Sequence, residues 1–298
     1  MKKTLYILLF VYSTILPQTA GNSGLSFLKI GFGARNLGMS DLGVVGANDV
    51  TALNYNPALL INSSNAQILV SHNEWIQDLR SELFGATFTM FDLPFAVGIN
   101  TTTISDIEVR TRPGEVESTF NAHFFFGSIS TGFRVFDRLS SGFTIKYLYE
   151  NLLTDESAGM AFDIGLFYEK LLNTVDVGLS LRNIGSLSKL RNEATELPLD
   201  LRAGILYDFD LVDLKSKVTL IGGLQTYTKT DDYHSHFGFE IFYDNLVSLR
   251  SGYVTGYDSK NLSFGFGLLW KRLNFDYAFT PFDYDLGNSH TLSIIYSF

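Results

Sequence analysis

The sequence predicts an all-β protein: a transmembrane antiparallel β-barrel of about 14 strands with an N-terminal hatch or plug inside its lumen. Three observations predict this fold class. Apolar and polar residues alternate along nearly all of the chain after residue 66, short and long connections alternate, and Phe298 ends a strand-like stretch without a polar tail. Period-two alternation is typical of strands with one apolar face, and alternating connection lengths are typical of outer-membrane barrels.

The composition limits the classes of function. Of the 298 residues, 46% are hydrophobic and 18% are charged, whereas about 25% charged residues are usual in soluble domains. The net charge of −9 argues against a nucleic-acid partner, which requires a concentrated basic surface. The chain has no cysteine, which excludes disulfides and thiolate metal sites.

The first residues indicate export. Lys2 and Lys3 precede an apolar run over residues 5–16, and small residues follow at Ala20 and Gly21, where we expect cleavage. The run is shorter than the roughly 20 residues that a spanning helix needs. We therefore expect a signal peptide over 1–20, a hatch over 21–62 and a barrel over 63–298.

The expected hatch is rich in glycine and shows little alternation. Asn56 and Pro57 fit the cap and the first position of a short helix. So small a segment buries too little apolar surface to fold alone, but a barrel of about 14 strands leaves room for it in the lumen. We expect Arg35 to pair with lumenal carboxylates, because its guanidinium matches them bidentately. The candidate hatch residues are Gly33, Ala34, Arg35, Gly38, Asn56, Pro57 and Ala58.

Alternation places the strands and their connections. We expect strands near 66–76, 81–91, 94–104, 120–136, 140–151, 159–169, 174–183, 200–209, 217–227, 234–242, 246–254, 261–270, 273–280 and 290–298. Short inner turns include 92–93, 137–139, 169–173, 210–216, 243–245 and 271–272, and longer outer loops include 105–119, 152–158, 184–199 and 281–289. A soluble β-sandwich also alternates, but its polar faces would carry more charge than these do.

Charged residues recur on the face opposite the apolar one. The expected lumen-facing residues are Lys146, Glu150, Arg182, Arg202, Glu240, Arg250 and Asp276. A polar lumen, hydrated or paired with the hatch, explains them, because barrel interiors are polar by default. The alternative is a ligand path lined by these groups.

The last strand is suited to closing the barrel. Leu292, Ile294, Tyr296 and Phe298 lie on one face, and pairing of this strand with the first would leave no open edge in lipid. An aromatic residue at the chain end fits the membrane–water boundary.

No pattern indicates catalysis, a cofactor or a metal. His234 and His236 lie on one strand face without further ligands, and no spacing selects a Ser/His pair. The stretch "GFGARNLG" lacks the Gly-Lys-Ser/Thr ending of a phosphate loop. We therefore expect a protein that is not an enzyme.

The stretch "GARNLGMSDLGVVGANDVTALNYNPALL" resembles the N-terminal signature of the PorV/PorQ family of the type IX secretion system. It is more distantly similar to FadL-type transporters of hydrophobic compounds, which share an Asn-Pro-Ala element. The resemblance implies a 14-stranded barrel in the outer membrane of a Gram-negative bacterium, among outer-membrane lipids. It also implies a non-enzymatic accessory role in protein secretion or surface presentation, with secretion components or secreted proteins as partners.

Two other roles stay open. One is passive uptake of a hydrophobic small molecule through the hatch region, as the more distant resemblance implies. The other is a purely structural or assembly role.

Overall fold

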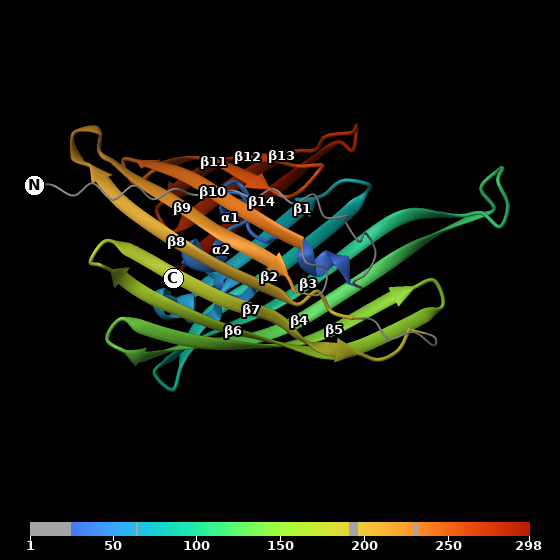
Figure 1. Cartoon of the computed structure of the whole chain (residues 1–298), viewed down its shortest axis with the longest axis horizontal. Helices are drawn as coiled ribbons and strands as arrows, with labels where there is room; N and C mark the ends of the chain where they lie inside the picture. The colour runs from blue at the N-terminus through green and yellow to red at the C-terminus, as the bar shows by residue number, and fades with distance from the viewer. Residues whose placement is uncertain (1–24, 64, 191–195, 229–231) are drawn as a thin grey trace, which may run out of the picture.

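A computed structural model describes residues 25–63, 65–190, 196–228 and 232–298. In this part of the chain, fourteen antiparallel strands form a closed barrel, and the expected signal peptide at 1–20 lies outside the described residues (Figure 1). The strands are β1 (Gln67–Glu74), β2 (Leu79–Met90), β3 (Leu93–Val109), β4 (Ser118–Phe136), β5 (Leu139–Leu152), β6 (Asp155–Leu171), β7 (Val175–Leu187), β8 (Asp200–Leu211), β9 (Ser216–Tyr227), β10 (Asp232–Tyr243), β11 (Val247–Thr255), β12 (Leu262–Trp270), β13 (Leu273–Pro281) and β14 (Asn288–Ser297).

Each strand pairs with its neighbours in sequence, and β14 pairs with β1 to close the cylinder. Ile294 lies opposite Val70, and the Phe298 amide donates a hydrogen bond to the Ala66 carbonyl at 3.0 Å. No strand edge is left unpaired at the seam, which is what a bilayer interior requires of a sheet.

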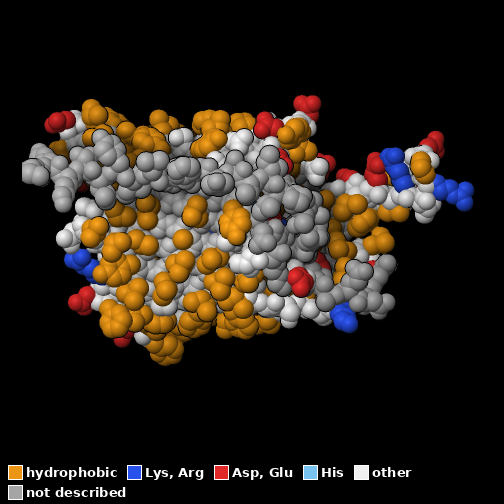
Figure 2. Space-filling model, viewed as in Figure 1, with side chains coloured by type: hydrophobic (Ala, Val, Ile, Leu, Met, Phe, Trp, Pro, Cys, Tyr) orange, Lys and Arg blue, Asp and Glu red, His pale blue; other side chains and the backbone are white. Residues whose placement is uncertain are grey.

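The two faces of the sheet differ in polarity as the alternation predicts. On β14, Leu292 and Ile294 point outward and are 55% and 43% exposed, whereas Thr291 and Ser293 point inward and are buried. Figure 2 shows hydrophobic side chains spread over the barrel wall and charged ones near its two ends. Such a wall suits contact with acyl chains. Among the described residues, no helix is long and apolar enough to cross a membrane.

Two expected outer loops are wrong in extent. Residues 105–109 and 118–119 belong to a two-stranded ribbon and only 110–117 form the connection, because β3 and β4 continue pairing past a bulge between Ile104 and Ile107 and project beyond the rim (Figure 1). The expected loop at 152–158 is a two-residue connection, because Asp155 and Ser157 pair with Leu152 and Glu150. Polar residues extend strands here since backbone pairing does not require apolar side chains.

Residues 25–62, called the N-terminal segment below, pack against the inner wall of the barrel (Figure 1). Their short helices are η1 (Ser26–Lys29), α1 (Ala34–Leu37), α2 (Gly43–Gly46), α3 (Ala52–Tyr55) and η2 (Pro57–Asn62); a further one, η3 (Val212–Leu214), follows β8. The Ala34 amide donates to Ser293 Oγ at 2.9 Å, and Thr144 Oγ1 donates to the Leu53 carbonyl at 3.3 Å. The segment thus satisfies its backbone partly through the barrel wall.

We predict that a charge on the outer wall destabilises the barrel. Phe237 lies in the middle of β10 and is 56% exposed. Phe237→Arg should lower the free energy of unfolding by about 2–4 kcal/mol, the cost of a cation near the bilayer midplane. Unfolding in lipid vesicles measures this loss of free energy, with Phe237→Leu as the control. If the arginine variant is as stable as the parent, the wall does not face lipid.

Candidate functional site

Glycines on the inner wall form a surface onto which the N-terminal segment fits. Gly132, Gly142 and Gly165 lie side by side on β4, β5 and β6. A Cβ added at Gly142 would lie 2.5 Å from the Pro57 carbonyl carbon and 2.6 Å from the Ala58 nitrogen. The backbone of the segment therefore occupies the space that larger side chains would take.

A second row of glycines repeats this contact on the next strands. Gly178, Gly204 and Gly223 are neighbours across β7, β8 and β9. A Cβ at Gly178 would lie 2.2 Å from the Val44 carbonyl oxygen. Sequence alone does not predict this role, because the pattern places glycine at alternate, inward positions but does not identify the segment that lies opposite.

Asn56 and Pro57 begin η2 as predicted, and this cap is confirmed. Asn56 Oδ1 accepts a hydrogen bond from the Ala58 amide at 3.1 Å. Asn56 Nδ2 donates to the carbonyls of Val44 at 2.8 Å and Leu166 at 3.0 Å. One fully buried amide thus joins α2, η2 and strand β6.

The other candidate residues of the segment surround α1. Gly33 precedes α1 with a φ of 79°, a conformation that favours glycine. Ala34 is fully buried. Gly38 approaches the wall so closely that an added Cβ would lie 3.0 Å from Gly265 Cα.

Arg35 pairs with a lumenal carboxylate, which confirms the expectation from its chemistry. Its Nε and Nη2 donate to both oxygens of Glu240, at 3.1 Å and 2.9 Å, and its Nη1 donates to the Gly46 carbonyl at 2.6 Å. Burial would lower the pKa of Arg35, but Glu240 raises it above its usual range, so the guanidinium stays charged. Glu240 also accepts from Arg250, which pairs with Asp276 at 2.6 Å.

A second ion-pair network lies nearer the outer end of the barrel, the end with the longer connections. Asp200 accepts from Arg182 at 2.9 Å and from Arg202 at 3.0 Å. Both arginines also hold the N-terminal segment: Arg182 donates to the Asn54 carbonyl at 2.6 Å and Arg202 to the Asp41 carbonyl at 2.7 Å. The wall and the segment therefore share one network.

The remaining candidate charges lie inside the barrel but apart from these networks. Lys146 pairs with Asp163 at 2.6 Å and donates to Asn183 Oδ1 at 3.1 Å, beside a bulge in β7. Glu150 is 3% exposed and forms no ion pair within the described ranges. Asp41, Asp163 and Asp200, which complete the networks, were not among the predicted residues.

The two strand histidines are buried inside the barrel. The rings of His234 and His236 lie 6.5 Å apart, and His236 hydrogen bonds the Ser40 carbonyl and Gln225 Oε1. Across the described part of the chain, no group of three or more metal-type side chains is placed to hold an ion.

An apolar cluster fills the outer half of the interior. Phe27 of η1 stacks on Phe124 and Phe126 of β4, at ring-centroid distances of 5.1 Å and 6.4 Å. Phe32 meets Phe126 edge-on at 5.7 Å. Phe27, Phe32 and Leu37 are all buried, so the segment itself occupies the apolar space at this end.

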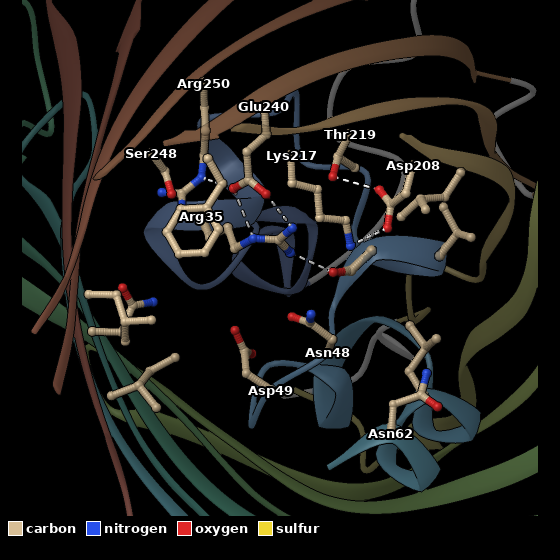
Figure 3. A pocket seen from close by; sticks show the side chains of 18 of the residues that line it. Arg35, Asn48, Asp49, Asn62, Asp208, Lys217, Thr219, Glu240, Ser248 and Arg250 are labelled. Atoms are coloured by element: carbon tan, nitrogen blue, oxygen red, sulfur yellow. Dashed lines mark hydrogen bonds and ion pairs between the residues drawn. The ribbon is translucent and has the colours of Figure 1, made fainter. Parts of the chain in front are cut away.

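A cavity of about 550 Å³ lies at the opposite, inner end, where the short turns are. It is bounded by the N-terminal segment on one side and by the ends of strands β6 to β14 on the other (Figure 3). The Arg35–Glu240–Arg250 network forms part of its lining. The interior thus contains an apolar cluster near its outer end, an open cavity at its inner end and ion-pair networks that reach from one to the other.

We predict that Arg35→Ala destabilises the protein. Breaking a buried ion pair costs about 3–5 kcal/mol, and we expect a value at the low end because Arg250 still contacts Glu240. Thermal unfolding in detergent measures the loss. Arg134→Ala is the control: its pair with Glu169 is exposed, so the change should stay within about 1 kcal/mol. Equal stability of the Arg35 variant and the parent would contradict an anchoring role.

We also predict that the glycine rows tolerate no side chain. Gly142→Val should lower the free energy of unfolding by about 1–3 kcal/mol, the usual cost of overpacking, because Pro57 and Ala58 would have to move. Gly127→Val, on the outer face of β4 with no atom nearer than 3.6 Å to an added Cβ, is the matched control. If both variants unfold alike, the close contact does not exist.

Comparisons with solved structures identify the fold. No protein family and no curated protein matches the sequence. Among solved structures, the Pseudomonas putida toluene transporter TodX aligns with a TM-score of 0.65 at 12% identity, over 90% of this chain and 98% of its own. The CymD monoaromatic hydrocarbon channel aligns at 0.61 and 16%, over 90% and 98%. A Pseudomonas aeruginosa FadL homologue aligns at 0.59 and 11%, over 89% and 98%. The chain therefore has the barrel fold of these FadL-like proteins.

Proposed function

We propose that this chain is a non-enzymatic outer-membrane channel for passive passage of hydrophobic small molecules, with residues 25–62 as its hatch. The observation that carries the proposal is the fold: two of the similar solved structures are a toluene transporter and a monoaromatic hydrocarbon channel. The apolar outer wall supports a place among outer-membrane lipids.

The interior supports this proposal in two further ways. The cluster around Phe27 supports a path for aromatic rings near the outer end, since four phenylalanines already contact one another there. The cavity at the inner end provides an exit space that is lined partly by apolar side chains. The N-terminal segment lies between these two regions, so passage requires part of it to move.

The ion-pair networks inside the barrel suggest how such a movement of the segment can be reversible. Arg35, Arg182 and Arg202 hold the segment through hydrogen bonds to Glu240 and to carbonyls, and these are directional contacts that can re-form. The glycine rows present no side chains of their own to the segment. A hatch that shifts along this surface can return to the same position.

The filled interior favours a second candidate, the secretion accessory role implied by the PorV/PorQ resemblance. A barrel that passes no small molecule would act through its outer rim, where the β3–β4 ribbon projects (Figure 1). Under this alternative, secreted proteins or secretion components should co-purify with the barrel from native membranes.

A crosslink tests the transport proposal. The Ser40 amide donates to Ser263 Oγ at 3.0 Å, so these two residues join the segment to β12, and the chain has no cysteine of its own. In Ser40→Cys/Ser263→Cys expressed in a Gram-negative host, oxidation should reduce uptake of radiolabelled toluene to the level of cells without the barrel. Reduction should restore it.

The two single cysteine variants are the controls, and their uptake should not respond to oxidation. If the oxidised double variant admits toluene as fast as the reduced one, the hatch proposal is wrong. If none of the variants raises uptake above background, the chain does not conduct toluene at all.

A further inference from the structure

The cavity at the inner end carries an excess of negative charge. Its lining contains four carboxylates, Asp49, Asp176, Asp208 and Glu240, against three basic side chains, Arg35, Lys217 and Arg250. Glu240 lies between the two arginines, and Arg250 is shared with Asp276 as well. Lys217 is paired with Asp208 at 2.6 Å. Each basic side chain of the lining is therefore paired directly with a carboxylate other than Asp49, and the charge of Asp49 acts on Arg35 only without direct contact.

Asp49 is a buried carboxylate of this cavity that makes no direct contact with a cation among the described residues. It lies between α2 and α3 and is 7% exposed. Its Oδ1 accepts hydrogen bonds from the Thr51 amide at 2.7 Å and from the Thr51 hydroxyl, and it forms no ion pair within the described residues. Its carboxylate points into the open space below Arg35 (Figure 3). A buried carboxylate is costly unless a cation or further donors approach it.

The rest of the lining combines amide and hydroxyl side chains with apolar ones, and the apolar ones suit a carbon framework rather than a bare ion. Val45 and Leu59 come from the N-terminal segment, and Phe167, Leu206 and Phe242 come from the wall. A volume of about 550 Å³ falls in the range of small-molecule sites, which combine apolar walls with a few placed polar groups.

We propose that this cavity binds an amphipathic organic cation, an amine whose ammonium group contacts Asp49 and whose apolar body packs against Val45, Phe167 and Leu206. The bound ammonium would supply the charge that the lining lacks and donate hydrogen bonds to the free oxygen of Asp49. This inference does not depend on passage through the hatch, because the cavity opens at the inner end of the barrel.

The test compares two probes of the same shape on the folded mature chain in detergent. Calorimetry should show phenethylamine binding at least about tenfold more tightly than neutral 2-phenylethanol, as expected for a hydrogen bond to a buried charge. Asp49→Asn, which retains an oxygen for Thr51, should abolish this preference. Asp208→Asn/Lys217→Gln removes a carboxylate together with its cation from the same lining, and should leave the preference unchanged.

Two results would overturn the proposal: equal affinities of the parent for both probes, or a preference for the amine that survives Asp49→Asn. Should the Asp49 variant not fold, Leu206→Trp fills the cavity from β8 and should abolish binding of both probes. Amine binding that persists in Leu206→Trp would place the site elsewhere. Because these readouts are equilibrium affinities, they stay informative even if toluene uptake fails.

Discussion

Buried ion pairs connect the inner wall of this barrel with the N-terminal segment, which supplies part of the pairing. Arg35 completes the coordination of Glu240, and the carbonyls of Asp41 and Asn54 accept from Arg202 and Arg182. Removing such partners would leave buried charges unpaired, which costs several kcal/mol per ion. The charged groups of the barrel wall and those of the segment therefore depend on each other for their partners.

The packing of the inner wall also depends on the N-terminal segment. Rows of glycine on β4 to β6 and on β7 to β9 let the segment backbone approach the wall directly. Asn56 then uses one amide to join α2, η2 and β6. An empty barrel with these glycines would expose backbone to its lumen, so the wall sequence is matched to a filled interior. The apolar cluster around Phe27 adds hydrophobic burial at the outer end.

Alternation alone predicted the strands because polarity with period two is a local property of the chain. Local chemistry also predicted the Asn56–Pro57 cap and the preference of Arg35 for a carboxylate. Local chemistry cannot predict that the partner of Arg35 is Glu240. The two residues are 205 positions apart, and their pairing depends on where the segment lies against β10. The glycine rows, Asp200 and the inner cavity were missed for the same reason: each exists only once strands distant in sequence are in register. The β3–β4 ribbon was taken for a loop because its polar residues mask the pairing.

Amide hydrogen exchange on the folded chain in lipid nanodiscs tests most directly the central claim that residues 25–62 form part of the barrel interior. The account predicts that amides of α1, α3 and η2 exchange as slowly as those of β5 and β6, since both are buried and hydrogen bonded. Exchange of this segment at the rate of an unstructured peptide, beside protected strands, would contradict it.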